Sequence, residues 1–258
     1  MNSLHLASIR LRVAGLARSV DFYASKLGFV VLAQTTTHAE LATEKNSASI
    51  LVLDEDRAAP AAPRDAAGLF HAALLFPSRA ALGGWLRVAA DRGVEFDGFS
   101  DHGVSEAIYF SDPDGNGLEF YSDRARETWP FSAGGEVAMV TQPLNLPSLL
   151  AEAKPAPDAP LAGATWGHLH LRVTDLARSE KFYRDNLGVT LTQGSYPGAR
   201  FLAADGYHHH LGLNSWGHPR APQPPAALGL AEAVFARSGA EEKTQRDPDG
   251  IALRLTRL

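Results

Sequence analysis

Histidine, aspartate, glutamate and tyrosine are the side chains of this sequence that could bind a metal ion or move a proton. The chain has 258 residues, with 10 histidines, 29 acidic residues and no cysteine. Disulfides, thiolate nucleophiles and cysteine-bound zinc or iron–sulfur clusters are therefore excluded. Any metal must be held by nitrogen and oxygen ligands, which suit an ion such as Fe(II), Mn(II) or Zn(II).

Three consecutive histidines form the densest group of these side chains. We expect His208–His210 to lie on or beside a strand over residues 209–214. On a strand, His208 and His210 would share one face, whereas His209 would take the other. One face should point inward, where an imidazole could bind a substrate. A histidine-rich hairpin tip in solvent is an equally good interpretation.

The composition is that of an ordinary globular chain. Apolar residues make up 45% and charged residues 21%, and the formal net charge of −5 provides no basic surface for nucleic acid or an anionic membrane. We expect neither a signal peptide in MNSLHLASIR nor a transmembrane helix, because no run of about 18 apolar residues occurs. The default expectation is a cytoplasmic protein that acts on a small or neutral molecule.

The elements that must position the reactive side chains are repeated. Residues 7–28 (ASIRLRVAGLARSVDFYASKLG) and 167–188 (GHLHLRVTDLARSEKFYRDNLG) agree at 11 of 22 positions without a gap. In each copy an alternating apolar run predicts a strand, and apolar residues at steps of three or four then predict an amphipathic helix. Asp175 suits the N-cap of the second helix, and Gly28 and Gly188 stand where a C′ glycine belongs.

Each copy continues with three β-like runs, so the repeated unit is strand–helix–three strands. These runs cover 29–36, 39–43 and 49–53 in the first copy, and 189–195, 199–204 and 209–214 in the second. A looser unit follows the first copy, with a helix expected over 78–92. A fourth unit is expected at 229–255, shortened so that its helix and one strand are missing.

The Pro/Ala-rich stretch AEAKPAPDAPLAGAT (151–165) is the clearest linker in the chain. We therefore expect a first domain of two units over 1–135 and an ordered connector over 136–165. A second domain, with one full and one abbreviated unit, is expected over 166–258.

This organisation resembles the vicinal oxygen chelate superfamily, which includes glyoxalase I, bleomycin-resistance proteins and type I extradiol dioxygenases. The opening segments GLFH (68–71) and GHLHL (167–171) and the closing segment DPDGNGLE (112–119) carry the resemblance. It implies an α+β fold in which paired βαβββ modules form open, cupped, mixed β-barrels, with the fourth module truncated. DHGVSEAIYFSDPDGNGLEFYSDR (101–124) and YHHHLGLNSW (207–216) are most similar to the catechol 2,3-dioxygenase-like group.

The superfamily takes its metal ligands from the first strand of each unit and the last strand of one or both. The first-strand positions hold Ser8, His71, His168 and Glu232, and the last-strand positions hold Glu119 and Arg254. The resemblance therefore implies a metal site of His71, His168 and Glu119. Two histidines and one carboxylate suit Fe(II), or alternatively Mn(II), and leave adjacent positions open for substrate and O₂.

This site requires the second unit to pair with the third, across the connector. A competing set lies within the second half and comprises His168, one of His208–His210, and Glu232. Taken singly, a histidine or glutamate on a strand is more often an ordinary polar residue than a ligand. The case for a site depends on several such residues at equivalent positions of the repeat.

The resemblance also implies which residues handle protons and substrate. His102 and Tyr109 precede Glu119 by 17 and 10 residues, and they would be a general acid/base and a hydrogen-bond donor. The alternative is that His102 caps the loop around Asp101–Gly103 and that Tyr109 packs in the core. His209, His210 and Trp216 are the candidate substrate-binding residues.

The resulting hypothesis is an Fe(II)-dependent extradiol dioxygenase that acts on a catechol-type aromatic diol and O₂. A glyoxalase-type isomerase, lyase or transferase of the same fold is one alternative. A non-enzymatic binding or resistance protein that has lost its metal is the other. Homo-oligomers are common in this superfamily, so a homo-oligomer is possible here too.

Overall fold

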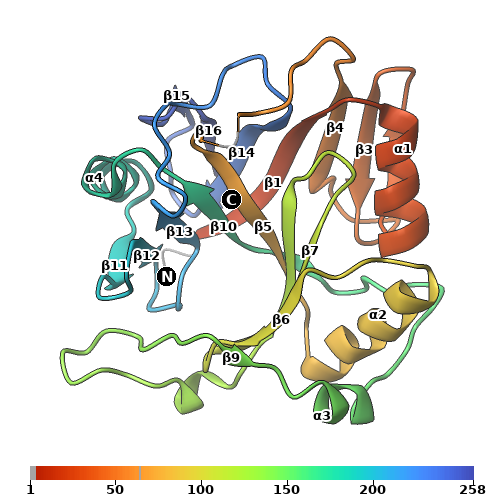
Figure 1. Cartoon of the computed structure of the whole chain (residues 1–258), viewed down its shortest axis with the longest axis horizontal. Coiled ribbons are helices and arrows are strands. Elements are labelled where there is room, and N and C mark those ends of the chain that lie inside the picture. The colour runs from red at the N-terminus through yellow and green to blue at the C-terminus, as the bar shows by residue number, and fades with distance from the viewer. Residues whose placement is uncertain (1–3, 64) are drawn as a thin grey trace.

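Two mixed β-sheets form the body of the molecule, with helices at the periphery (Figure 1). The computed structural model describes residues 4–63 and 65–258. The strands are β1 (Leu4–Val13), β2 (Val30–Gln34), β3 (His38–Ala42), β4 (Leu51–Glu55), β5 (Gly68–Leu75), β6 (Gly98–Asp101), β7 (Ser105–Ser111), β8 (Gly117–Asp123), β9 (Gln142–Pro143), β10 (Thr165–Arg172), β11 (Thr190–Gln193), β12 (Ala199–Ala203), β13 (Leu211–Asn214), β14 (Gly229–Arg237), β15 (Lys243–Arg246) and β16 (Ala252–Arg257).

Helices follow the first strands of the first three modules, as expected, and two short helical segments come after the second module. The helical segments are α1 (Leu16–Val20), which continues as the π-helical segment η1 (Asp21–Leu27), α2 (Arg79–Asp91), the short 3₁₀ turn η2 (Arg126–Thr128), α3 (Leu146–Ala151) and α4 (Leu176–Leu187). The predicted caps are confirmed: Asp175 accepts a hydrogen bond from the Arg178 amide, and Gly28 and Gly188 have φ of 99° and 65°. Among the described residues, no helix is both long and apolar enough to cross a membrane.

The sheets combine modules from the two halves of the sequence. One sheet has the order β15-β16-β14-β1-β4-β3-β2 and joins the first module to the fourth. The other has the order β11-β12-β13-β10-β5-β8-β7-β6-β9 and joins the second module to the third. The α+β fold of paired βαβββ modules is confirmed. The fourth module consists of β14, β15 and β16, without a helix in the described chain, so the predicted truncation is also confirmed.

The two motifs that recur in the sequence bind each other across modules. The hydroxyl of Tyr23, in the FY pair of the first helix, donates to Asp112 Oδ2 at 3.0 Å, and Asp112 opens the DPDG turn of the second module. Tyr183 and Asp247 repeat this contact at 2.8 Å between the third and fourth modules. Burial raises the pKa of both aspartates. The repeated FY and DPDG segments therefore tie together consecutive modules that lie in different sheets.

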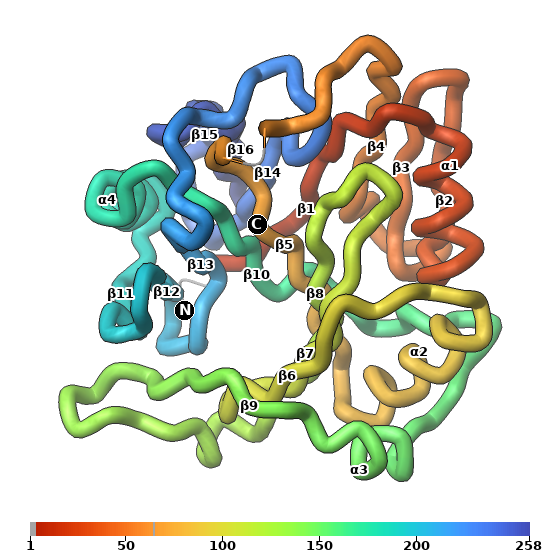
Figure 2. The backbone as a smooth tube through the Cα atoms, in the orientation of Figure 1, coloured from red at the N-terminus to blue at the C-terminus, as the bar shows by residue number. Residues whose placement is uncertain are grey.

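The connector between the halves forms part of the nine-stranded sheet. Its strand β9 pairs with β6, one edge of the second module. The amide of Val137 donates to the carbonyl of Thr192 in β11, at the opposite edge, at 3.0 Å. Figure 2 shows this stretch of chain running from β9 to below β11 and β12. The connector thus spans the open side of the cup that the second and third modules form.

We predict that Tyr23→Phe and Tyr183→Phe each lower the free energy of unfolding by about 1–2 kcal/mol, because each removes a hydrogen bond to a buried carboxylate. Urea unfolding monitored by tryptophan fluorescence measures the change. The two variants are matched controls for each other, since they remove equivalent contacts in the two halves. Wild-type stability in both would mean that these bonds do not hold the modules together.

Candidate functional site

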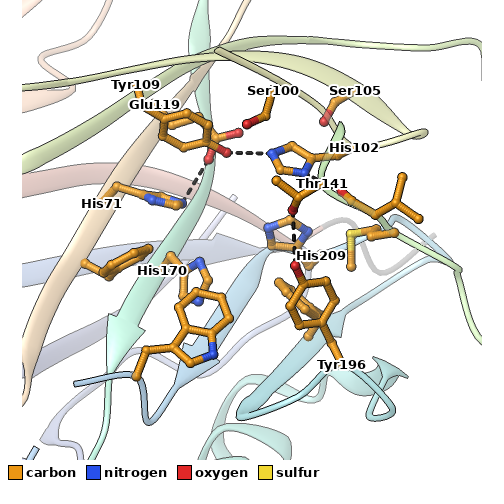
Figure 3. Close-up of a pocket in the computed structure, with 15 residues that line it drawn as sticks. His71, Ser100, His102, Ser105, Tyr109, Glu119, Thr141, His170, Tyr196 and His209 are labelled. Atoms are coloured by element: carbon orange, nitrogen blue, oxygen red, sulfur yellow. Dashed lines mark hydrogen bonds and ion pairs between the residues drawn. The ribbon is translucent and has the colours of Figure 1, made fainter. Parts of the chain in front are cut away.

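Three buried ligand groups meet on the concave face of the nine-stranded sheet. His71 lies on β5, His168 on β10 and Glu119 on β8, and one ligand atom from each lies within 4.8 Å of the others. Figure 3 shows His71 beside Glu119 at one end of a pocket. The structure therefore brings together the three residues predicted as metal ligands, from both halves of the chain.

The spacing of these atoms fits ligands around one metal ion. His71 Nε2 and His168 Nε2 lie 2.9 and 3.2 Å from the same oxygen, Oε2 of Glu119. Ligands at about 2.1 Å from an ion and at right angles around it lie about 3.0 Å apart. His71 Nε2 is buried and has no hydrogen-bond partner, although it is close to the carboxylate. This nitrogen points to a place that a cation would occupy.

The protonation of the site suits metal binding at neutral pH. Burial lowers the pKa of His168 to about 4, although Glu119 opposes that shift. Burial alone would raise the pKa of Glu119, but His168 and His71 outweigh it and hold this pKa well below its usual range. Neutral His168 and an ionised carboxylate are the forms that ligate a divalent metal.

Strand alternation and register explain why these side chains converge. Ala73 on β5 pairs with His168 on one side and with Glu119 on the other, so the three residues form one row across the sheet. His71 lies two residues before Ala73 and therefore points to the same face. The small Ala73 side chain lies between His168 and Glu119 in this row.

His102 and Tyr109 also lie in the pocket and bind each other. The Nδ1–H of His102 donates to the carbonyl of Val140 at 2.6 Å, so its Nε2 accepts from the Tyr109 hydroxyl at 2.7 Å. Burial and the nearby Glu119 raise the pKa of Tyr109 well above its usual range. The loop at 101–103 is capped by Asp101 and not by His102. The connector, through Val140, thus fixes the tautomer of His102.

The histidine run lies beside a strand rather than on it, and His209 is the member of the run that lines the pocket. The strand β13 begins at Leu211, and the three histidines lie in the bend before it. His208 is fully buried, whereas His209 lines the pocket with its ring 4.1 Å from that of His168, measured between centroids. His210 is not among the described residues that line the pocket. Its Nδ1 instead accepts a hydrogen bond from the Ala204 amide at 3.2 Å.

The pocket is a cavity of about 290 Å³ with aromatic walls. Its lining comprises Phe70, His71, Ser100, His102, Ser105, Tyr109, Glu119, Met139, Val140, Thr141, His170, Tyr196, Phe201, His209 and Trp216. Trp216, predicted to bind substrate, is among them. Glu119 is the only acidic residue of this lining, and neither lysine nor arginine contributes to it.

Several lining residues could not be found from the sequence. Met139, Val140 and Thr141 belong to the connector, which has no repeat counterpart from which a role could be inferred. His170 is buried with no partner for its Nε2, and its ring packs over Gly212, where a Cβ would lie 2.8 Å from it. The sequence could have indicated His170 by its position two residues after His168, which places both side chains on the same face of the strand.

The competing metal set is not assembled. Glu232 lies on β14 of the other sheet, where Arg254 and Arg10 approach its two oxygens at 3.6 and 3.9 Å. In this sheet, residues that form ion pairs thus occupy the positions that hold the metal ligands in the nine-stranded sheet. Ser8 lies on β1 and Arg254 on β16 of the same sheet, and Arg254 is engaged by Glu232.

Comparison with known proteins agrees with this architecture. A family model described as Glyoxalase/Bleomycin resistance protein/Dioxygenase superfamily matches residues 5–120 and 165–240. A Bacillus subtilis (strain 168) protein named catechol-2,3-dioxygenase is 42% identical over 231 residues, which is 88% of this chain and 80% of that protein.

Solved structures show the same fold at low sequence identity. A Bacillus subtilis structure superposes with a TM-score of 0.65 at 12% identity, covering 98% of this chain and 84% of that one. Glyoxalase I from Zea mays superposes with a TM-score of 0.58 at 16% identity, covering 98% and 92%. These similarities concern the arrangement of modules alone.

We predict that Glu119→Ala abolishes metal binding, whereas Glu232→Ala retains it. The first change removes the only carboxylate from the donor set, which should weaken the affinity for Fe(II) by more than about 100-fold. The second removes an equivalent residue from the other sheet and is the matched control. Metal analysis of the purified, reconstituted variants measures the difference. Metal retained in the Glu119 variant would exclude this site.

We also predict that the metal-free protein loses stability as the pH falls from 6.5 to about 4. His168 takes up a proton below pH 6.5 when unfolded but only near pH 4 when folded, so the unfolded state binds more protons in this window. His168→Gln should lack this contribution, which approaches about 1.4 kcal/mol per pH unit in mid-window. Urea unfolding at several pH values tests this, and parallel stability curves for the two proteins would contradict it.

Proposed function

The chain belongs to the Glyoxalase/Bleomycin resistance protein/Dioxygenase superfamily, and from this premise we propose that it is a metal-dependent extradiol dioxygenase acting on a catechol. One observation carries the proposal: two imidazole nitrogens and one carboxylate oxygen meet at the end of an aromatic-walled cavity, with His102, Tyr109 and His209 around it. The name of the 42% identical Bacillus subtilis relative supports it.

The donor set fits Fe(II), with Mn(II) as the alternative. The ion would be held by His71 Nε2, His168 Nε2 and an oxygen of Glu119. When bound, it would supply Lewis acidity to the two diol oxygens and electrons for the reduction of O₂. The other side chains of the pocket determine how the diol enters and where its protons go.

The pocket residues would orient the ring and move protons. Phe70, Phe201 and Trp216 form apolar walls that would contact the faces or edges of one aromatic ring. The imidazole of His209 can accept a proton from a diol hydroxyl and return it later, and His102 can do the same once Tyr109 releases its Nε2. The Tyr109 hydroxyl donates a hydrogen bond to His102 in this structure. When that hydrogen bond breaks, the same hydroxyl can donate to a diol oxygen.

The charge of the lining indicates which diols are accepted. Because no lysine or arginine of the part of the chain that the structure describes lines the cavity, a carboxylate on the substrate would be desolvated without a counter-ion. Catechol and catechols with small uncharged substituents therefore fit best. The same argument disfavours a glyoxalase-type reaction on an anionic thiol conjugate.

We predict that anaerobically Fe(II)-reconstituted protein consumes O₂ in stoichiometric amounts with catechol and 4-methylcatechol, with formation of a yellow ring-opened product. The value of kcat/KM for 3,4-dihydroxybenzoate should be lower by at least about 10-fold, since its carboxylate has no partner. An oxygen electrode and absorbance measure both effects.

Three other outcomes are informative. Bound iron without oxygen uptake on any diol would exclude the dioxygenase and favour an isomerase of the same fold. Absence of metal binding would favour a non-enzymatic binding protein. Equal rates with the acidic and the neutral diols would contradict the substrate class while leaving the reaction intact.

A further inference from the structure

A buried chain of hydrogen bonds runs from the end of β8 to the pocket. The Nε2 of His208 lies 2.9 Å from Asp123 Oδ1, and its Nδ1 lies 2.8 Å from Nδ1 of His209. We infer that Asp123 and His208 are positioning residues, which hold the His209 ring with an unprotonated Nε2 directed to the cavity. This inference rests on the proposed function and adds two residues to its proton-handling groups.

The assignment of hydrogens follows from the chemistry of the partners. An ionised carboxylate only accepts, so the Nε2 of His208 must carry a hydrogen and donate it to Asp123. The Nδ1 of a neutral His208 is then an acceptor, and His209 must donate to it from its own Nδ1. In neutral His209 this leaves Nε2 with a free lone pair, and Nε2 is the nitrogen available to the cavity.

The surroundings hold this chain in one arrangement. The second oxygen of Asp123 accepts from the Tyr207 hydroxyl at 2.9 Å, so both carboxylate oxygens are engaged. His208 is fully buried, with the rings of Tyr207 and Trp129 at centroid distances of 4.0 and 5.1 Å. Rotation of the His208 ring would leave the Asp123 contact unmade in a site closed to water.

The chain also crosses between modules. Asp123 ends the last strand of the second module, whereas His208 and His209 precede the last strand of the third. The position of the His209 ring thus depends on the same pairing of modules that assembles the metal ligands. Because the His209 ring is held in this way, it loses little conformational entropy when it takes up a proton. Supporting hydrogen bonds commonly orient reactive residues like this.

The test compares His208→Leu with His208→Asn. Leucine removes the acceptor for His209, so kcat for catechol should fall about 10- to 100-fold while KM and metal content change little. Asparagine can place Oδ1 where Nδ1 was, so it should restore most of the rate. His38→Leu is the matched control, because His38 and Asp54 form a similar pair at 2.7 Å in the other sheet; its kcat should equal that of the wild type.

A second measurement does not depend on turnover. In the metal-free protein, ¹⁵N NMR of the histidine rings should show the Nε2 of His209 unprotonated, and His208→Leu should convert it to a mixture of tautomers. A protonated Nε2 in the wild type, or equal kcat in the leucine variant and the wild type, would overturn the inference. If the wild type shows the expected tautomer but no diol consumes O₂, the proposed function fails while the positioning of His209 stands.

Discussion

The antiparallel pairing of β5 with β10 is the contact on which the rest of the site depends. These strands come from different halves of the chain, and their register places His168 opposite Ala73 and His170 opposite His71. A shift by one residue would turn His168 to the other face of the sheet. The metal ligands, His170 and the Asp123–His208–His209 chain all lie across this seam. Long-range pairing, and not local structure, therefore creates the chemistry.

Both sheets have this antiparallel pairing of first strands from different halves, and they differ in the residues at the equivalent positions. In the nine-stranded sheet, the equivalent positions hold two histidines and a glutamate close enough to share an ion. In the seven-stranded sheet, Glu232 lies between two arginines, and its neighbours are partly exposed. Ion pairs of this kind contribute little free energy when solvated. The second sheet keeps the fold while its polar face carries no ligand set.

The connector narrows the open cup to a pocket that remains partly open to solvent. Strand β9 extends the sheet at β6, and Val137 binds the opposite edge at β11. Glu136 strengthens that second contact by accepting from the hydroxyl of Ser195 at 2.6 Å and from the Gly194 amide. Hydrogen bonds and charges inside such a cavity are stronger than in water, because the local dielectric is lower. The segment that looks like a simple linker in the sequence therefore contributes to the electrostatics of the site.

The sequence by itself determined the repeated βαβββ units and the truncated fourth unit, whereas its resemblance to the superfamily implied the metal site and left a second ligand set open. Internal repetition and strand alternation are local patterns, so they can be read without knowing the fold. The tertiary structure alone decided that the second unit pairs with the third, that His209 and not His210 faces the pocket, and that Asp123 and Val140 orient the two pocket histidines. The repeated modules have similar strand edges, so the local sequence does not specify which two modules pair. Long-range packing makes that choice.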